Sequence, residues 1–367
     1  MTPGITPQNA GLTRHDEWDD VAKAPGHAKR LERIRAIAPG FKKDFLQTGP
    51  AVAVRTLPVA RAPYLVTYGF NRACSLPYPY LLFQNRAMVI QFRQRGALKT
   101  LLFNPTIPER SATAPFFAAV AKKLRAPKAV QRAIVKEGAP IPQQLESLGL
   151  RADQIDYLAF DHQHVQDLRP YLGTSSTPSM YPNAKVLVQR PDWEASVQPH
   201  PLQRTWWVEN SAEGALTQNL VVLDGDYSLG DGVALMATPG HTWGNQSLLF
   251  RAPDSGCYTV SENGICADAY APQRSKIPGL KAHARASGEE VILNGNTLEG
   301  SLDQYNSMVK EKLLADPMKA DGEFVQHFSS SELVHTALAP GLKPTHTIGE
   351  ISEGQLAQAE PQRQAAS

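Results

Sequence analysis

The sequence predicts an α/β protein of the α+β kind, with a histidine-bearing turn at the end of each of two core strands. Two apolar runs of strand length, residues 153–160 and 233–237, each end in such a turn. Helical stretches, most clearly residues 113–150 and 303–315, occur between and after the strands. Because α/β proteins tend to place their sites at the carboxyl ends of strands, these two turns are the first candidates for a functional site.

The first histidine turn follows a helix and a buried strand. A helix is expected to end at Leu148, with Gly149 as its cap, and the apolar run that follows it stops at Asp161. His162 and His164 come directly afterwards, separated by one residue. In an extended loop this spacing places both imidazoles on the same side.

The second histidine turn follows the strand predicted over 233–237. His241 lies in the sequence Thr238-Pro239-Gly240-His241, which the Pro-Gly pair marks as a turn. The segments 246–250 and 257–260, joined by a turn at 253–256, then predict a hairpin. Three convergent neutral imidazoles with an open fourth position are typical of a catalytic zinc site rather than a closed structural one.

The organisation along the chain predicts one main domain with additions at both ends. Residues 1–50 are expected to be an N-terminal extension, polar and broken by prolines, with one helix around residues 27–37. Residues 51–350 form the expected domain, in which 51–105 supply the first strands and 113–150 form a helical insert near the active site. The tail, residues 351–367, is expected to be flexible.

Composition limits the class of protein and its partners. The chain has 367 residues, 42% of them hydrophobic, which is ample for a buried core. A formal net charge of +2 gives no reason to expect a nucleic-acid partner. Three cysteines (Cys74, Cys257, Cys266) neither build a disulfide framework nor show zinc-finger spacing. With no signal sequence and no membrane-spanning run visible, we expect a cytoplasmic protein with a small-molecule substrate, and the sequence leaves a homo-oligomer open.

Several segments in this order resemble the metallo-β-lactamase superfamily, and within it the lactonase-like hydrolases. They are Ile155–Asp167, Tyr181–Gln189, Leu229–Val233 and Thr238–Ser247. The resemblance implies an αββα sandwich, in which two mixed β-sheets lie face to face with helices outside and metal at one edge. It also implies that His162, His164 and His241 hold a first metal ion, expected to be zinc, with manganese or iron as alternatives.

The motif departs from the family pattern where the second metal binds. The family carries His-x-His-x-Asp-His, and this chain has Gln166 and Asp167 at the last two positions. An amide oxygen is a weak ligand, whereas Asp167 is a hard oxygen donor. The resemblance therefore implies one zinc ion and leaves the second ion, with Asp167 as a ligand, open.

Two further ligand positions have alternatives. The resemblance implies a bridging carboxylate after the hairpin, and Asp268 is slightly favoured over Glu262 or Asn263. It also implies a late histidine, for which His327 is the first candidate and His346 the rival.

The implied activity is hydrolysis of an ester, lactone or amide by metal-activated water. Asp167 or Asp161 would accept the proton, and Asp161 could instead orient a ligand imidazole. Tyr270 would donate to the leaving group. The alternative from another class is a degenerate family member that binds a ligand or partner without catalysis. An iron-dependent oxidoreductase is disfavoured, since the sequence shows no flavin-binding extension.

Overall fold

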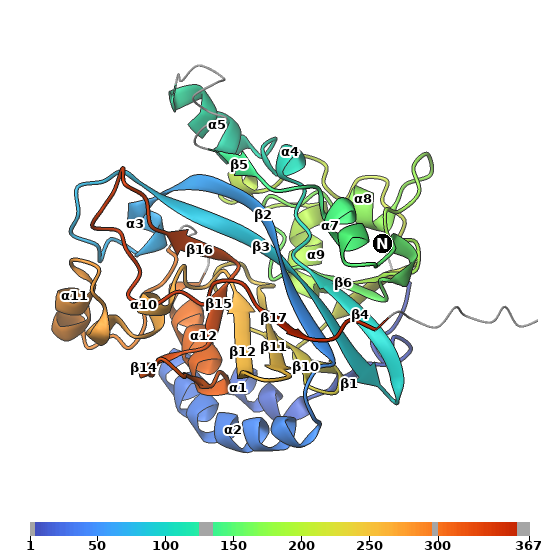
Figure 1. Ribbon diagram of the computed structural model, residues 1–367, viewed down its shortest axis with the longest axis horizontal. Helices are drawn as coiled ribbons and strands as arrows, with labels where there is room; N and C mark the ends of the chain where they lie inside the picture. Colours follow the sequence, from blue (N-terminus) through green and yellow to red (C-terminus); the bar gives the residue numbers. More distant parts are fainter. Residues whose placement is uncertain (1–3, 125–134, 296–299, 358–367) are drawn as a thin grey trace, which may run out of the picture.

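Two β-sheets pack face to face in the computed structural model, which describes residues 4–124, 135–295 and 300–357 (Figure 1). Helices cover the outer faces of both sheets, so the molecule is an αββα sandwich, as predicted. Within the described ranges, no helix is both long and apolar enough to cross a membrane.

The first sheet combines antiparallel strands with a parallel half. Strands β4, β6, β7 and β8 run parallel to one another, and the others pair antiparallel. In order across the sheet its strands are β17 (Ser352–Gly354), β2 (Ala53–Leu65), β3 (Tyr80–Gln94), β4 (Ala97–Phe103), β6 (Tyr157–Ala159), β7 (Lys185–Gln189) and β8 (Leu220–Leu223), with β16 (Ser331–Val334) paired to β3 and β5 (Lys136–Glu137) paired to β2.

The second sheet is mostly antiparallel and contains the predicted hairpin. Its strands, in order, are β1 (Thr13–Arg14), β9 (Tyr227–Gly230), β10 (Val233–Ala237), β11 (Gln246–Ala252), β12 (Gly256–Ser261) and β15 (His327–Ser329). β12 and β15 pair in parallel. A small separate ribbon is formed by β13 (Pro317–Met318) and β14 (Asp321–Val325).

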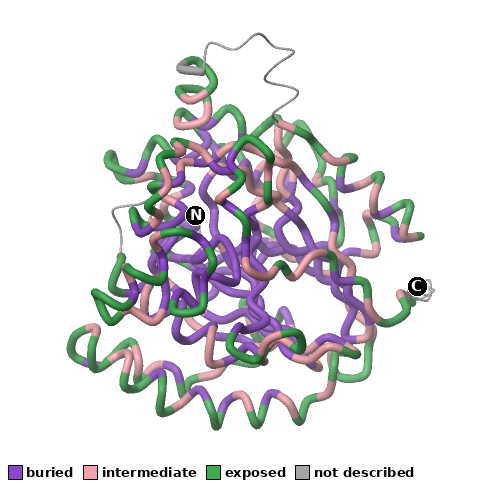
Figure 2. The backbone as a smooth tube through the Cα atoms, turned by 60° about the vertical axis from the view of Figure 1, so that its left-hand side comes forward, coloured by how far each residue is buried: buried purple, intermediate pink, exposed green. Residues whose placement is uncertain are grey.

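Alternation along the strands builds the core between the sheets. In β3, Met88, Ile90 and Phe92 face the other sheet, while Ala87 and Val89 face the outer helices. The same alternation in β10 and β11 sends every second apolar residue into the shared core. Figure 2 shows the buried backbone gathered in the centre of the molecule and the exposed segments around it.

The helices are grouped by the layer that they cover. The outer face of the first sheet carries α7 (Ile141–Ser147), α8 (Arg169–Leu172) and α9 (Arg190–Val197), and that of the second carries α1 (Asp19–Lys23), α2 (His27–Gln47) and α12 (Ser301–Leu314). The other helices, many of them in connecting loops, are α3 (Val66–Gly69), α4 (Pro108–Ser111), α5 (Pro115–Leu124), α10 (Ala267–Tyr270), α11 (Leu280–Ser287) and the 3-10 turns η1 (Asp16–Trp18), η2 (Ala152–Gln154), η3 (Arg204–Trp206) and η4 (Pro272–Arg274).

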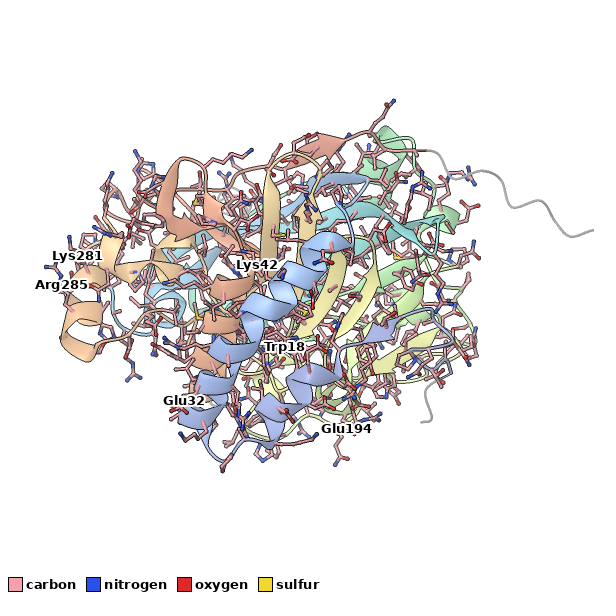
Figure 3. All side chains as sticks on the ribbon, turned by 90° about the horizontal axis from the view of Figure 1, so that it is seen from below. Trp18, Glu32, Lys42, Glu194, Lys281 and Arg285 are labelled. Carbon is pink, nitrogen blue, oxygen red and sulfur yellow. The ribbon has the colours of Figure 1, made fainter. Side chains whose placement is uncertain are left out.

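The N-terminal segment, expected to be an extension, packs against the second sheet of the sandwich. β1 pairs with β9, and α2 lies across the outer face of the second sheet, as Figure 3 shows from below, with Trp18 beside it. α2 continues through Pro39, because Ile34, Ala38, Phe41 and Phe45 place one apolar face on the sheet. An internal proline costs about 3 kcal/mol or more. Burial of two phenylalanine side chains, roughly 1.5–3 kcal/mol each, offsets it.

The expected insert and tail are described in part. Within 113–150 the structure describes α5, β5 and α7, while residues 125–134 lie outside the described ranges. The tail contributes the edge strand β17, and residues 358–367 also lie outside them. The predicted buried strand and the hairpin are confirmed as β6, β11 and β12, and the late helix is confirmed as α12.

Candidate metal centre

Three histidines from the two sheets meet at one edge of the sandwich. His162 and His164 follow β6 of the first sheet, and His241 follows β10 of the second. One ring nitrogen from each lies within 4.8 Å of the other two, and all three side chains are buried. Zinc binds imidazole nitrogen at about 2.0–2.1 Å, so small side-chain movements bring all three to one ion.

His164 shows that these residues fit a metal ion. Both of its ring nitrogens are buried and have no hydrogen-bond partner within the part of the chain that the structure describes. Burial, followed by the charge of His162, holds the pKa of His164 well below its ordinary value, so the ring is neutral. A neutral imidazole is the form in which histidine binds a metal ion, and a bound ion would give these buried nitrogens the partner that they lack among the described residues.

His162 is held by the carboxylate of Asp161. Its Nδ1 lies 2.8 Å from Asp161 Oδ1, which leaves Nε2 for a metal. Ser330 donates to the other oxygen at 2.6 Å, and Asn104 Nδ2 donates to Ser330 at 2.9 Å. Burial opposes charge on His162, but Asp161 and Glu262 raise its pKa to about 9. The surroundings of His162 therefore favour positive charge, whether a proton or a metal ion supplies it.

Asp192 joins the two histidine loops and was not predicted. Its buried carboxylate accepts the backbone N–H of Gln163 at 2.8 Å and that of Gly244 at 2.9 Å. A Cβ on Gly244 would lie 2.5 Å from the backbone nitrogen of Asp192, so the close approach requires glycine. The available signal was an acidic residue in the first turn of α9, after a buried strand.

Asp167, predicted to be a ligand or the base, does not join the cluster of the three histidines. Its Oδ2 accepts from Arg110 at 2.7 Å, and both oxygens accept from Arg169 at 2.8 and 2.9 Å. Burial is outweighed by these two arginines, which lower the pKa of Asp167. Its neighbour Gln166 donates to Thr106. Two guanidinium groups occupy the carboxylate, because charge-assisted pairs of this geometry are strong.

Glu262, rather than Asp268, lies beside the histidines. The two oxygens of Asp268 accept from Ser275 and Thr345 at 2.5–2.8 Å, away from the cluster. Glu262 lines the same cavity as His162 and His164. Burial, followed by the charge of Asp161, raises the pKa of Glu262 to about 7. The count from the hairpin could not show which carboxylate turns inward, so Asp268 as the bridging ligand stays a prediction beside Glu262.

The other expected site residues also lie elsewhere. His327 Nδ1 lies 3.0 Å from Thr259 Oγ1, and its ring stacks on Tyr270 with centroids 3.9 Å apart. His346 pairs with Asp321. The Tyr270 hydroxyl donates to Glu311 at 2.6 Å and is fully buried, so it cannot reach a leaving group in this arrangement. No carboxylate and no fourth histidine of the described residues shares the cluster of His162, His164 and His241.

The backbone of Asn294 lies next to His241 and was overlooked. Asn294 is buried, hydrogen-bonds through its backbone to the His241 ring, and accepts from the Tyr64 hydroxyl through its side chain. In the sequence, Asn294-Gly295-Asn296-Thr297 has the composition of a turn, of which residues 296 and 297 lie outside the described ranges. The apolar run at 291–293, ending in an Asn-Gly pair, was the available signal.

A cavity of about 750 Å³ opens onto the cluster. Its polar end contains His162, His164, Gln166 and Glu262. Its remaining wall is mainly apolar and comes from β2, β3, the segment containing α4 and α5, η3 and the residue before β5. These apolar lining residues are Val59, Ala60, Ala62, Pro63, Phe83, Pro108, Ala112, Phe117, Val120, Ala121, Val135 and Trp206.

Aromatic rings connect this wall to the cluster. The Trp206 ring stacks on His164 with centroids 5.8 Å apart, and on Phe116 of α5 at 4.0 Å. Trp207 meets His164 edge-on at 5.2 Å. Trp206 therefore both lines the cavity and packs against His164. Trp243, by contrast, is 52% exposed.

Comparison with known proteins gives relatives for part of the chain. No protein-family model matches it. The chain is 30% identical over 112 residues to the N-acyl homoserine lactonase AiiA of Bacillus thuringiensis subsp. kurstaki. It is 29% identical over 112 residues to the N-acyl homoserine lactonase of a Bacillus species. Each match covers 30% of this chain and 39% of the relative, so the chain spans about two fifths of the length of these curated relatives.

Two solved structures align with the chain at low identity. A quorum-quenching N-acyl homoserine lactone lactonase is 18% identical, covers 66% of this chain and 89% of its own, and has a TM-score of 0.44. AidC, a dizinc quorum-quenching lactonase, is 11% identical, covers 85% and 99%, and has a TM-score of 0.48. The sequence relationship and the αββα sandwich confirm the resemblance to lactonase-like proteins of the metallo-β-lactamase superfamily.

Proposed function

We propose that the protein is a metal-dependent hydrolase that opens a lactone or ester bond in a small molecule with an apolar chain. The observation that carries this proposal is the placement of three buried histidines at the polar end of a largely apolar cavity. The partial sequence relationship to N-acyl homoserine lactonases supports the lactone and the acyl chain as the substrate features.

The residues have separate tasks in the proposed reaction. His162, His164 and His241 would hold one zinc ion, with manganese or iron as alternatives. When bound, zinc supplies a Lewis acid and lowers the pKa of water to about 7. Glu262 faces the same cavity, and its carboxylate oxygen would take up the proton of the attacking water, in place of Asp167. General-base assistance of this kind contributes typically about 10²–10⁴-fold.

The apolar wall would bind the chain of the substrate. Phe117, Val120 and Ala121 occupy one face of α5 and line the cavity opposite the strand β2. Burial of about 25 cal/mol per Å² of apolar surface would orient the scissile bond toward the histidines. Polar groups at the polar end of the cavity would then contact the lactone ring or ester group of the substrate.

One observation favours the alternative of a binding protein without catalysis. Asp167, which stands at a ligand position of the family motif, is committed to Arg110 and Arg169. A second metal would therefore lack this ligand. The binding role predicts a purified protein with no bound metal and no hydrolysis after addition of zinc, manganese or iron.

The deciding experiment combines metal analysis with an activity screen. Purified protein is analysed for bound metal and assayed with N-acyl homoserine lactones and aryl esters of increasing chain length, before and after chelation. We expect one tightly bound equivalent and hydrolysis that chelation abolishes. The double variant His162→Ala, His164→Ala is the matched control and should lose both. A fully metal-free, inactive wild type would contradict the proposal.

A further inference from the structure

We infer that Glu311 is a positioning residue that holds the two turns on which His241 and Glu262 are mounted. Glu311 lies on α12, is 1% exposed, and does not line the cavity as described. The inference rests on the proposed metal site, but its first test is done on metal-free protein. The set of Glu311 with Ser247, Ser261, Asn263 and Tyr270 is here named the Glu311 network.

One carboxylate oxygen fixes the turn that carries Glu262. Ser261 Oγ and Asn263 Nδ2 donate to Glu311 Oε1 at 2.7 and 2.8 Å. These two residues flank Glu262 directly in the sequence. The backbone N–H of Asn263 also donates to Ser261 Oγ at 3.1 Å, which closes the turn. Because both neighbours of Glu262 are hydrogen-bonded to one atom, the backbone of Glu262 is held in place and its side chain is directed toward the cavity.

The same oxygen is linked to the turn that carries His241. Ser247 Oγ donates to Glu311 Oε1 at 2.5 Å and lies 2.7 Å from Thr238 Oγ1. Asn245 Nδ2 donates to both the carbonyl and the hydroxyl oxygen of Thr238. Thr238 begins the turn that ends at His241. In that turn, a Cβ on Gly240 would lie 2.2 Å from Gln304 on the same helix as Glu311. The turn is thus seated directly on α12.

The second oxygen explains the place of Tyr270. Its hydroxyl donates to Glu311 Oε2 at 2.6 Å, and its ring stacks on His327. This bond uses the other oxygen of the carboxylate from the three donors to Oε1, although the hydroxyl also interacts with the Ser261 side chain. Loss of the Tyr270 hydroxyl should therefore leave both turns tied, which makes it a matched control within the network.

The chemistry of the carboxylate makes the inference testable by substitution. A carboxylate accepts at both oxygens, whereas a glutamine keeps one accepting oxygen and presents a donor on the other side. Glu311→Gln can retain the three bonds to Oε1 if its amide nitrogen faces the Tyr270 oxygen. Glu311→Met has similar length and accepts none of them. The conservative variant should therefore rescue what the apolar variant loses.

The first experiment measures amide hydrogen exchange in metal-free protein. In Glu311→Met we expect exchange to become about tenfold faster in segments 238–245 and 261–263, while β4 exchanges as in the wild type. Glu311→Gln and Tyr270→Phe should stay close to the wild-type rates. Uniformly faster exchange, or the same change in Tyr270→Phe, would show a general loss of packing and overturn the inference.

If Glu311→Met does not fold, single serine variants test the same positioning role. Ser247→Ala should loosen segment 238–245 alone, and Ser261→Ala should loosen segment 261–263 alone. If neither variant affects its own turn, Glu311 does not position them.

The second experiment titrates zinc against a competing chelator. Groups that support metal ligands from outside typically change metal affinity by about 10–100-fold. We expect a loss of that size in Glu311→Met or Ser247→Ala and near wild-type affinity in Tyr270→Phe. Faster amide exchange in the two turns with unchanged zinc affinity would show that Glu311 does not support metal binding. A wild type that binds no zinc would instead refute the proposed function and leave the exchange result standing.

Discussion

Asp161 decides which nitrogen of His162 is free for a metal. Its Oδ1 also accepts the backbone N–H of His162 at 2.8 Å, so backbone and ring are held by one oxygen. Ser330 occupies the other oxygen. A carboxylate in this position fixes the tautomer and makes the ring a better ligand.

Asp161→Asn should weaken zinc binding by about 10–100-fold, because it removes the charge that supports His162 and keeps the shape. Competition titration with a chromogenic chelator measures this. Ser330→Ala is the control, since it removes only the bond to the far oxygen, and its effect should be smaller. Equal affinity in Asp161→Asn and wild type would show that the carboxylate does not support the site.

Asp167→Asn should reduce stability rather than activity. The substitution leaves the guanidinium groups of Arg110 and Arg169 without their carboxylate. Both arginines are partly exposed, so water replaces part of the loss and we expect a cost of about 1–2 kcal/mol. Urea unfolding measures the cost, and zinc titration should give the wild-type affinity. A large fall in turnover with unchanged stability would show that Asp167 takes part in the reaction.

At the level of secondary structure, α5 forms one wall of the cavity and stands away from the sandwich in Figure 1. Ala119 and Ala121 on this helix are both exposed, but only Ala121 lines the cavity as described. The two alanines therefore offer a matched pair of positions on one helix.

Ala121→Trp should shorten the apolar end of the cavity. We expect KM for long-chain substrates to rise by about tenfold or more, since several buried CH₂ groups at about 0.8 kcal/mol each are displaced. Short-chain substrates should keep their wild-type KM. Ala119→Trp should change neither value. If both variants behave alike, α5 does not contact the substrate chain.

The elements near the site were predictable where the information is local. The β6 and β10 strands end in polar turns whose residues follow directly in sequence, so His162, His164 and His241 could be found from pattern alone. Arg110 reaches Asp167 across 57 residues and Asp192 reaches Gly244 across 52. No local pattern reports such pairings, which is why the arginine partners of Asp167 were not predicted and Asp192 was missed. α2 was cut short for a related reason, because the sheet that stabilises it beyond Pro39 lies elsewhere in the chain.

At the scale of the whole molecule, the histidine cluster bridges the two sheets. His162 and His164 follow a strand of one sheet, and His241 follows a strand of the other. An ion bound by all three would therefore fasten the layers together at one edge, in addition to the shared apolar core.

Removal of metal should lower the thermal stability of the whole sandwich. An ion present at 100 times its dissociation constant stabilises the folded state by about 2.7 kcal/mol. We expect Tm to fall on addition of a chelator and to recover when zinc is restored, as measured by calorimetry. In the double variant His162→Ala, His164→Ala, addition of the chelator should leave Tm unchanged. If the chelator also leaves the Tm of the wild type unchanged, no ion links the two sheets.

The two tryptophans around His164 give the protein an optical signal of its own. Trp206 stacks on that ring at 5.8 Å and Trp207 meets it edge-on at 5.2 Å, so both indoles are near neighbours of any ion that the imidazole binds. A paramagnetic ion such as cobalt or copper would quench their emission on arrival, while zinc would shift it without quenching. Occupancy of the site could thus be followed in real time by intrinsic fluorescence, without a label and without knowledge of the substrate.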